Sequence, residues 1–329
     1  MILTRAPLRV SFMGGNSDVP EFFLNEPGGG TVISTTIDKA VYVAVNRTPN
    51  DHIKVSYNDT EIVKDVNDLK HDRVREALKL YNIKSNIEIS SFADIPSAGS
   101  GLGSSSAFTV ALLMALREYK KKDVNPFIYS NSNIFKDSLK VEIDLCKNNI
   151  GHQDQAASFY GGFNQFWFSG TGCWKQQLES EEYHLDTFQK HLMMFRVGAT
   201  RDTNEVLSST PHVNKHEMIR RLVEITYEIP NLLKNKLYAG FGNALNESWM
   251  IKRETNALVT NTYIDDVYGH AIRSGALGGK LCGAGAGGHL LLLVYPHMQE
   301  AVESAMKDWG IERFPFSFST TGARVLYAD

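Results

Sequence analysis

The sequence predicts an α+β protein of two lobes, and two observations support that prediction. A chain of 329 residues is long enough to bury two cores of ordinary size. Its last quarter has the order helix, strand, glycine-rich loop, strand, helix, strand, which is typical of α+β proteins. The stretch 170–190 contains the acidic run 179–182 and predicts the boundary, with residues 1–180 in the first lobe and 181–329 in the second.

Strands and helices alternate along the chain. Long β-branched or alternating apolar segments predict strands, as in 31–46 and 86–92, and runs of good helix formers predict helices, as in 107–116. The predicted strands are 8–13, 31–46, 52–57, 86–92, 163–168, 191–197, 279–282, 289–295 and 314–318. The predicted helices are 19–24, 72–81, 107–116, 135–147, the end of 149–158, 215–236, 242–258, 265–274 and 298–309.

Composition excludes several classes of function. The 34 basic and 37 acidic residues are interspersed and give a net charge of −3, so we expect neither a nucleic-acid nor a membrane-surface partner. The 3 cysteines are widely separated and lack metal-ligand spacing, so a disulfide framework or a zinc site is not expected. Without a signal peptide or a membrane span in the sequence, the expected location is the reducing cytoplasm, and the oligomeric state stays open.

The stretch Ile95–Phe108 lies between a predicted strand and an apolar helix, and it predicts a phosphate-binding loop. The first N–H groups of a helix have no partner within the helix, and its dipole adds partial positive charge there. Glycines allow the backbone to approach phosphate oxygens closely, and serine hydroxyls can donate to them or bind a metal ion. The alternatives are a flexible linker or an ordinary serine cap. The predicted phosphate-binding residues are Gly99, Gly101, Leu102, Gly103, Ser104, Ser105 and Ser106.

Two further glycine-rich stretches indicate close approaches of the backbone. Gly28–Gly30 precedes a long predicted strand and suggests contact with a ligand or another backbone, so Gly29 and Gly30 are candidate substrate-binding residues. Gly283–Gly288 is followed by a strand, whereas a dinucleotide fingerprint requires a helix, so a nicotinamide role is excluded. We expect this turn to pack against the phosphate loop or the substrate, with Gly285 as a candidate contact.

Three carboxylates are candidates for chemistry. Phosphoryl transfer needs a phosphate cradle, a magnesium ion and a group that orients or deprotonates the acceptor hydroxyl. Ser105 with Glu142 could hold the metal, and Asp154 or Asp18 could contact a sugar hydroxyl. The alternatives are that Glu142 and Asp154 are solvated surface carboxylates and that Asp18 caps the helix 19–24.

Three motifs that contain glycines lie along the chain: the first is Arg5–Asp18, the second is 96–107 and the third is 280–288. In this order and at these separations they resemble the motifs of the GHMP kinases, a superfamily that includes galactokinase, homoserine kinase and mevalonate kinase. The resemblance spans nearly the whole chain. It implies an N-terminal ATP-binding α/β lobe, a C-terminal ferredoxin-like α+β lobe, and the cofactors ATP and Mg²⁺.

By position, the resemblance implies that Ser105 and Glu142 bind magnesium, although the neighbouring serines stay open as metal ligands. It also implies that Asp154 is the catalytic base and that Arg9 takes the basic position of the first motif. Arg9 near Asp154 would hold the carboxylate ionised and orient it. Asp18 matches a position that binds sugar hydroxyls in galactokinase-like members.

Within the superfamily the chain resembles the D-glycero-D-manno-heptose 7-phosphate kinase branch, which is close to fucokinase. That branch implies transfer of the ATP γ-phosphoryl group to the anomeric hydroxyl, giving a 1,7-bisphosphate for nucleotide-activated heptose synthesis. His152 and Arg201 are candidates for the substrate phosphate, although Arg201 could instead pair with Asp202 or Glu205. The alternatives are a 1-kinase for fucose or a hexose, and a nucleotide-binding regulator without catalysis.

Overall fold

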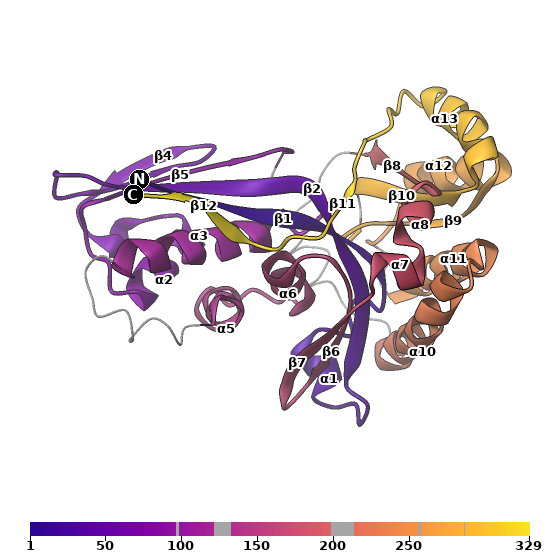
Figure 1. The fold of residues 1–329 in the computed structure, drawn as a ribbon, viewed down its shortest axis with the longest axis horizontal. Coiled ribbons are helices and arrows are strands. Elements are labelled where there is room, and N and C mark those ends of the chain that lie inside the picture. The colour runs from indigo at the N-terminus through magenta and orange to yellow at the C-terminus, as the bar shows by residue number, and fades with distance from the viewer. Residues whose placement is uncertain (97–98, 122–132, 199–213, 256–257, 286) are drawn as a thin grey trace.

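The structure is a computed structural model, and it describes residues 1–96, 99–121, 133–198, 214–255, 258–285 and 287–329. Arg201 lies outside the described residues. Figure 1 shows two groups of elements, a large sheet with helices on one side and a smaller sheet with its own helices. The α+β prediction is confirmed.

The large sheet is organised around two long strands, β1 (Ile2–Met13) and β2 (Gly30–Arg47), which pair antiparallel. Its path runs β12-β1-β2-β5-β3-β4, and β6 and β11 also pair with β2. The remaining strands are β3 (Ile53–Ser56), β4 (Thr60–Val63), β5 (Ile87–Ala93), β6 (Phe163–Ser169), β7 (Gly172–Gln177), β11 (Phe318–Ser319) and β12 (Arg324–Ala328).

Helices of the first half cover one side of the large sheet (Figure 1). Helix α3 (Ser104–Lys121) packs on β1 and β2, and its apolar run from Val110 to Leu116 is buried, as its sequence predicts. The other helices of this half are α1 (Pro20–Phe23), α2 (Asp72–Leu80), α5 (Ile134–Leu139) and α6 (Gln153–Tyr160). A π-helical turn, η2 (Lys140–Leu145), continues α5.

The smaller sheet has the antiparallel order β8-β10-β9, with β8 (Leu192–Val197), β9 (Ala276–Leu281) and β10 (Gly288–Val294). All seven residues of β10 are buried, because helices pack over the sheet. These helices and the short ones before β8 are α7 (Ser180–Tyr183), α8 (Leu185–Gln189), α10 (Lys215–Lys234), α11 (Tyr238–Thr255), α12 (Thr262–Arg273) and α13 (Gln299–Lys307).

The end of the chain returns to the large sheet. Strand β12 pairs with β1, and the amino group of Met1 lies 3.2 Å from Asp329 Oδ2, which brings the two termini together (Figure 1). The expected strand at 314–318 is shifted, because only Phe318 and Ser319 pair, with β2. The division at residue 180 stays a prediction. Strands β11 and β12, which follow residue 180, belong to the large sheet and not to the smaller one.

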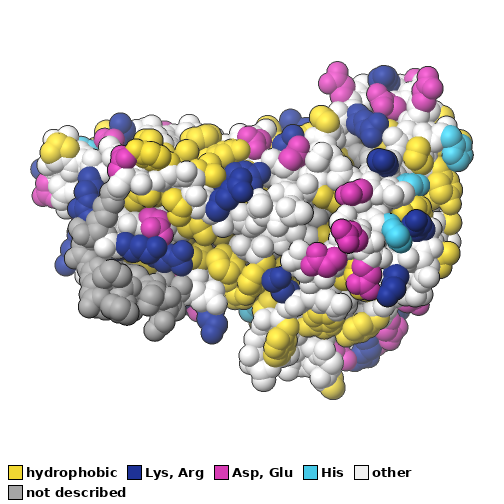
Figure 2. Space-filling view, in the orientation of Figure 1, with side chains coloured by type: hydrophobic (Ala, Val, Ile, Leu, Met, Phe, Trp, Pro, Cys, Tyr) yellow, Lys and Arg dark blue, Asp and Glu magenta, His cyan; other side chains and the backbone are white. Residues whose placement is uncertain are grey.

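No helix of the described residues is long and apolar enough to cross a membrane. Figure 2 shows Lys, Arg, Asp and Glu side chains interspersed over one face of the molecule, in line with the balanced composition.

Candidate active site

The phosphate loop consists of residues 99–106 and leads directly into α3, which begins at Ser104. Gly99, Gly101 and Gly103 have φ angles of 64°, 72° and 74°, in the left-handed region that residues with a Cβ avoid. The carbonyl of Gly103 accepts the first helical hydrogen bond, from the N–H of Ala107. The preceding turns therefore place the open N-terminus of α3 at the loop, as an anion site requires.

The glycine turn of the third motif packs against this loop. A Cβ on Gly283 would lie 2.4 Å from Gly101 Cα, and one on Gly101 would lie 2.4 Å from the carbonyl oxygen of Cys282. Nδ1 of the buried His289, on β10, lies 2.7 Å from the carbonyl oxygen of Ser100. Gly283 and Gly288 thus pack against the phosphate loop, one of the two partners expected for this turn, and the contact joins distant parts of the chain backbone to backbone.

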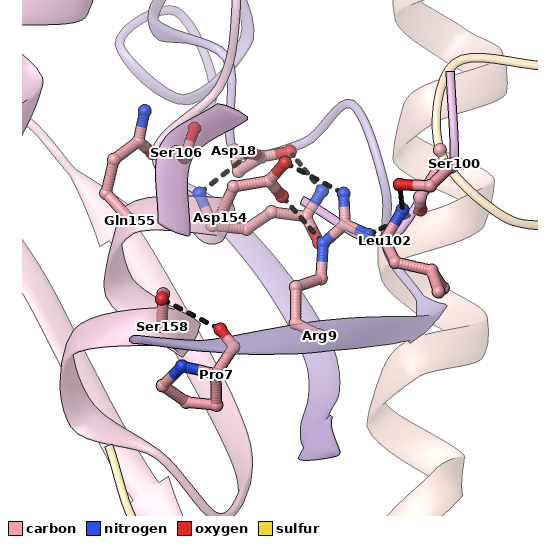
Figure 3. Close-up of polar contacts among 12 residues, drawn as sticks. Pro7, Arg9, Asp18, Ser100, Leu102, Ser106, Asp154, Gln155 and Ser158 are labelled. Carbon is pink, nitrogen blue, oxygen red and sulfur yellow. Dashed lines mark hydrogen bonds and ion pairs between the residues drawn. The ribbon is translucent and has the colours of Figure 1, made fainter. Parts of the chain in front are cut away.

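Arg9 and Asp154 form a two-pronged ion pair beside the loop (Figure 3). Arg9, on β1, donates from Nε to Asp154 Oδ1 at 2.7 Å and from Nη2 to Oδ2 at 2.8 Å. Its Nη1 donates to the carbonyl of Gly101 at 2.7 Å. Because a Cβ on Gly103 would lie 3.4 Å from Asp154 Oδ2, this carboxylate stands directly at the phosphate loop.

Asp18 lies next to Asp154 in the same close-up (Figure 3). Its side chain is buried and accepts the N–H of Gln153 at 3.0 Å and the Gln153 Nε2 at 3.3 Å. Burial raises the pKa of Asp18 to about 6, the Gln153 N–H opposes that shift, and the charge of Asp154 adds to it. The alternative that Asp18 caps α1 is wrong, because the N-cap of α1 is Val19 and α1 has no side-chain cap.

Glu142 is wholly buried in the π-helical turn η2 and is not a surface carboxylate. Its Oε1 accepts Arg73 Nε at 2.9 Å and Thr109 Oγ1 at 2.9 Å. Its Oε2 accepts Ser106 Oγ at 2.8 Å and Gln155 Nε2 at 2.5 Å. The extra residue of a π-helical turn is frequent at functional sites, and here it aims a carboxylate at α3.

A first cavity of about 570 Å³ opens between the phosphate loop, β1 and α6. Its lining includes Arg9, Asp18 and Asp154 from the predicted set. Three buried polar atoms in its wall have no partner among the described residues: Ser11 Oγ, Asn148 Nδ2 and Gln153 Oε1. Unpaired buried donors and acceptors indicate a polar ligand, because leaving them unsatisfied costs free energy.

Two lysines complete this wall. Lys252, on α11, donates from Nζ to the carbonyl of Gly283, and Lys280, on β9, donates to the carbonyl of Phe12 at 2.9 Å. Burial and the neighbouring Lys280 lower the pKa of Lys252 to about 7, and burial lowers the pKa of Lys280 to about 8. Within the described part of the chain neither lysine forms an ion pair and both donate to backbone carbonyls, so both favour an anionic ligand.

A second cavity of about 620 Å³ lies on the other side of the phosphate loop. Tyr57, Phe92, Ile95 and Phe108 supply apolar walls to it. Arg73, Ser104 and Ser105 line both cavities. The N-terminus of α3 therefore stands at the junction of the two spaces.

Several predicted residues have other surroundings. Cβ atoms on Gly29 and Gly30 would lie 2.3 Å from the Phe168 carbonyl oxygen and 1.8 Å from that of Ser17, and one on Gly285 would lie 2.6 Å from that of Val259. These glycines allow backbone to meet backbone. The ring of His152 packs between Phe23 and Phe168, and burial lowers its pKa to about 4, so it is neutral at pH 7. A neutral imidazole supplies no charge to a phosphate.

Oxygen donors for a magnesium ion are present at Glu142. A carboxylate and a serine hydroxyl are ligands that Mg²⁺ prefers. The serine that contacts Glu142 is Ser106, whereas Ser105 is exposed and lines both cavities. The donor set therefore fits the ion, although the hydrogen bonds on Glu142 must rearrange to admit it.

Several site residues were not predicted from the sequence, among them Arg73, Thr109, Lys252 and Lys280. Lys280 stands directly before the third glycine motif, and that position was a usable signal. Arg73 and Lys252 lie in helices whose charged residues look like solvated faces, and only the packing of distant elements brings them to the cavity.

Comparisons with known proteins agree with this geometry. The model of the GHMP kinases N terminal domain matches residues 40–162, and that of the GHMP kinases C terminal matches 229–312. The chain is 24% identical to the D-glycero-alpha-D-manno-heptose 7-phosphate kinase of Campylobacter jejuni, over 98% of each chain. It is 26% identical to a bifunctional fucokinase/GDP-fucose pyrophosphorylase of Arabidopsis thaliana, over 87% of this chain and 29% of that protein.

Among solved structures, one described as a D-glycero-D-manno-heptose 1-phosphate kinase from Bacteriodes thetaiotaomicron superposes with a TM-score of 0.79. Its identity is 22% and the match covers 100% of both chains, so it supports the fold. Together the two domain models cover more than half of the residues, in the order that the motifs predict. The chain belongs to the GHMP kinase family.

Proposed function

We propose that the protein transfers the γ-phosphoryl group of ATP to the anomeric hydroxyl of D-glycero-D-manno-heptose 7-phosphate, giving the 1,7-bisphosphate. The observation that carries the proposal is the Arg9–Asp154 pair, fixed beside Gly103 and open to the first cavity. The relative in Campylobacter jejuni, similar over 98% of the chain, supports the choice of substrate.

In this proposal Asp154 accepts the proton of the acceptor hydroxyl. The two hydrogen bonds from Arg9 keep the carboxylate ionised and oriented, and the guanidinium stabilises negative charge on the attacking oxygen. Mg²⁺, when bound by Glu142 and Ser106 or a neighbouring serine, would neutralise charge on the nucleotide phosphates. Asp18 and the unpaired polar atoms of Ser11, Asn148 and Gln153 are suited to sugar hydroxyls.

The two cavities suggest where the substrates lie. We propose the second cavity for the nucleoside, because a purine ring is well matched by its apolar walls, and the first cavity for the acceptor. The phosphates would then cross the N-terminus of α3 at Ser104 and Ser105, which both cavities share.

Lys252 and Lys280 are the candidates we propose for binding the 7-phosphate of the acceptor. His152 is neutral and walled by aromatic rings, whereas the two lysines line the first cavity with no ion pair among the described residues. Arg201 stays a prediction for the same role.

Rates of ADP release on a panel of acceptors test the proposed function. The panel is heptose 7-phosphate, unphosphorylated heptose, fucose, galactose and mevalonate, each with parent protein and with Asp154→Asn as the inactive control. We expect heptose 7-phosphate to have the highest kcat/KM, and ³¹P NMR to place the new phosphate on the anomeric carbon. Preference for an unphosphorylated sugar would overturn the proposed substrate. Absence of turnover on every acceptor would favour the alternative of a nucleotide-binding regulator without catalysis.

A further inference from the structure

Arg73 is a cavity residue that the proposed reaction leaves without a role. It lies in the first turn of α2, lines both cavities, and donates from Nε to Glu142 Oε1 at 2.9 Å. Its side chain is 23% exposed, whereas that of Glu142 is 0% exposed. The proposed metal ligand is therefore held by a cation that reaches it from the side of the cavities.

The hydrogen bonds of Glu142 leave no room for a further partner. A carboxylate accepts at about four lone-pair positions. Arg73 and Thr109 donate to Oε1, and Ser106 and Gln155 donate to Oε2. A magnesium ion that binds this carboxylate must consequently displace one of these four donors.

Arg73 is the donor best able to leave. Ser106 and Thr109 are buried on α3 and Gln155 is buried on α6, so their side chains are fixed by packing. Arg73 has the longest side chain of the four donors, and it is the one that is partly exposed. A guanidinium and Mg²⁺ also repel each other, and this repulsion disfavours both on one carboxylate oxygen.

We propose that Arg73 takes the place of the metal on Glu142 while no nucleotide is bound, and that it moves to a nucleotide phosphate when the metal–nucleotide complex enters. This inference rests on the proposed function, through the assignment of Glu142 as metal ligand. Once released, Arg73 stands beside Ser104 and Ser105 at the junction of the cavities, where a guanidinium can bind phosphate oxygens through two donors.

Two consequences follow for the protein without nucleotide. Free metal binds weakly, because it must displace an ion pair and gains no phosphate ligand in return. Metal and nucleotide bind cooperatively, because the nucleotide supplies the new partner that Arg73 needs. The exchange would keep Glu142 neutralised in both states, since a buried carboxylate without a cation is costly.

Titration of Mn²⁺ without nucleotide or acceptor, followed by electron paramagnetic resonance, tests the proposal. Arg73→Met should bind Mn²⁺ at least about tenfold more tightly than the parent protein, because the competing cation is gone. Arg73→Lys, which keeps a positive charge, should bind Mn²⁺ more weakly than Arg73→Met. Arg75→Met is the matched control: it lies on the same helix with a side chain 26% exposed, pairs with Glu76, and should behave as the parent does.

Thermal unfolding gives an independent measurement. Arg73→Met should have a lower Tm than the parent without metal, and Mn²⁺ should raise that Tm by more than it raises the Tm of the parent. Adding Glu142→Gln to Arg73→Met should abolish this response, because the carboxylate is then absent. If Arg73→Met fails to fold, Arg73→Gln keeps one donor and serves in the same titrations.

Equal Mn²⁺ affinity in Arg73→Met and the parent would overturn the proposal, as would a Tm response that survives Glu142→Gln. None of these measurements contains an acceptor, so their results do not depend on which sugar the protein phosphorylates. Conversely, a negative Mn²⁺ titration would not change the expected result of the acceptor panel. The two proposals can therefore fail separately.

Discussion

Asp154 and Glu142 are both carboxylates held by an arginine from a distant part of the chain, yet their surroundings differ. Asp154 is 26% exposed, receives both hydrogen bonds from Arg9 and faces the first cavity. Glu142 is 0% exposed and accepts four hydrogen bonds in the interior. The two carboxylates therefore differ in exposure: Asp154 reaches the first cavity, as the proposed base must, whereas Glu142 is enclosed by its four donors.

Asp154→Asn tests the catalytic half of this comparison and should have the largest effect. Loss of a general base lowers turnover by about 10²- to 10⁴-fold, while ATP binding should change little. Steady-state kinetics and nucleotide titration measure both quantities. Asp144→Asn, at an exposed position of η2, is the control and should keep the parent's rate. Unchanged turnover in Asp154→Asn would remove this residue from the mechanism.

Glu142→Ala tests the other half of the comparison, the contribution of the buried Glu142 to stability. Removing one partner of a buried ion pair costs about 3–5 kcal/mol, because Arg73 and three other donors lose their acceptor. Urea unfolding should show a much larger loss in Glu142→Ala than in Asp154→Asn. Asp144→Ala is exposed in the same turn and should stay within about 0.5 kcal/mol of the parent. Equal losses in the two carboxylate variants would refute the distinction.

The pH dependence of Asp18 extends the comparison to a third carboxylate. Its pKa of about 6 means that the carboxylate is lost below pH 6, so kcat/KM should fall there about tenfold per pH unit. Asp18→Asn should lack this limb of the profile, whereas Glu21→Gln, exposed on α1, should keep it. A limb that persists in Asp18→Asn would assign the titration to another group.

The same shift has a consequence for stability. Because the folded-state pKa is raised above 3.8, the proton contributes stability that is full below pH 3.8 and lost as the pH rises through about 6. Asp18→Asn should therefore be more stable than the parent at pH 8, by up to about 3 kcal/mol, and the advantage should shrink toward pH 4. Chemical denaturation at both pH values measures it.

Gly283→Ala tests the contact between the third glycine motif and the phosphate loop, and it should have the smallest effect. Gly283 and Gly310 have φ angles of 74° and 68°, but only Gly283 faces backbone, since a Cβ on Gly310 meets nothing within 4 Å. Gly310→Ala should cost about 1–2 kcal/mol from its φ angle alone. Gly283→Ala should cost about 1 kcal/mol more and raise KM for ATP, because Gly101 must shift. Equal stability and KM in the two variants would contradict the contact.

Much of the site could be predicted from the sequence, because it depends on local chemistry. Glycines at 99, 101 and 103 permit the positive φ angles of the loop, and the first N–H groups of the helix that follows have no partner within that helix. Most of the predicted helices and strands were found within a few residues. The strands β4, β7 and β12 were not predicted, since their mostly exposed residues carry little apolar alternation.

Local sequence patterns were enough to identify the motifs, the α+β class and the residue types that phosphoryl transfer needs. Long-range contacts, by contrast, bring Asp154 to Arg9, place Ser106 and Arg73 on Glu142, and bring Lys252 and Lys280 to the cavity. They also place Gly29, Gly30 and Gly285 against backbone and the ring of His152 between Phe23 and Phe168. The two kinds of feature differ because burial and charge pairing depend on elements far apart in the chain, whereas turn geometry depends on neighbouring residues.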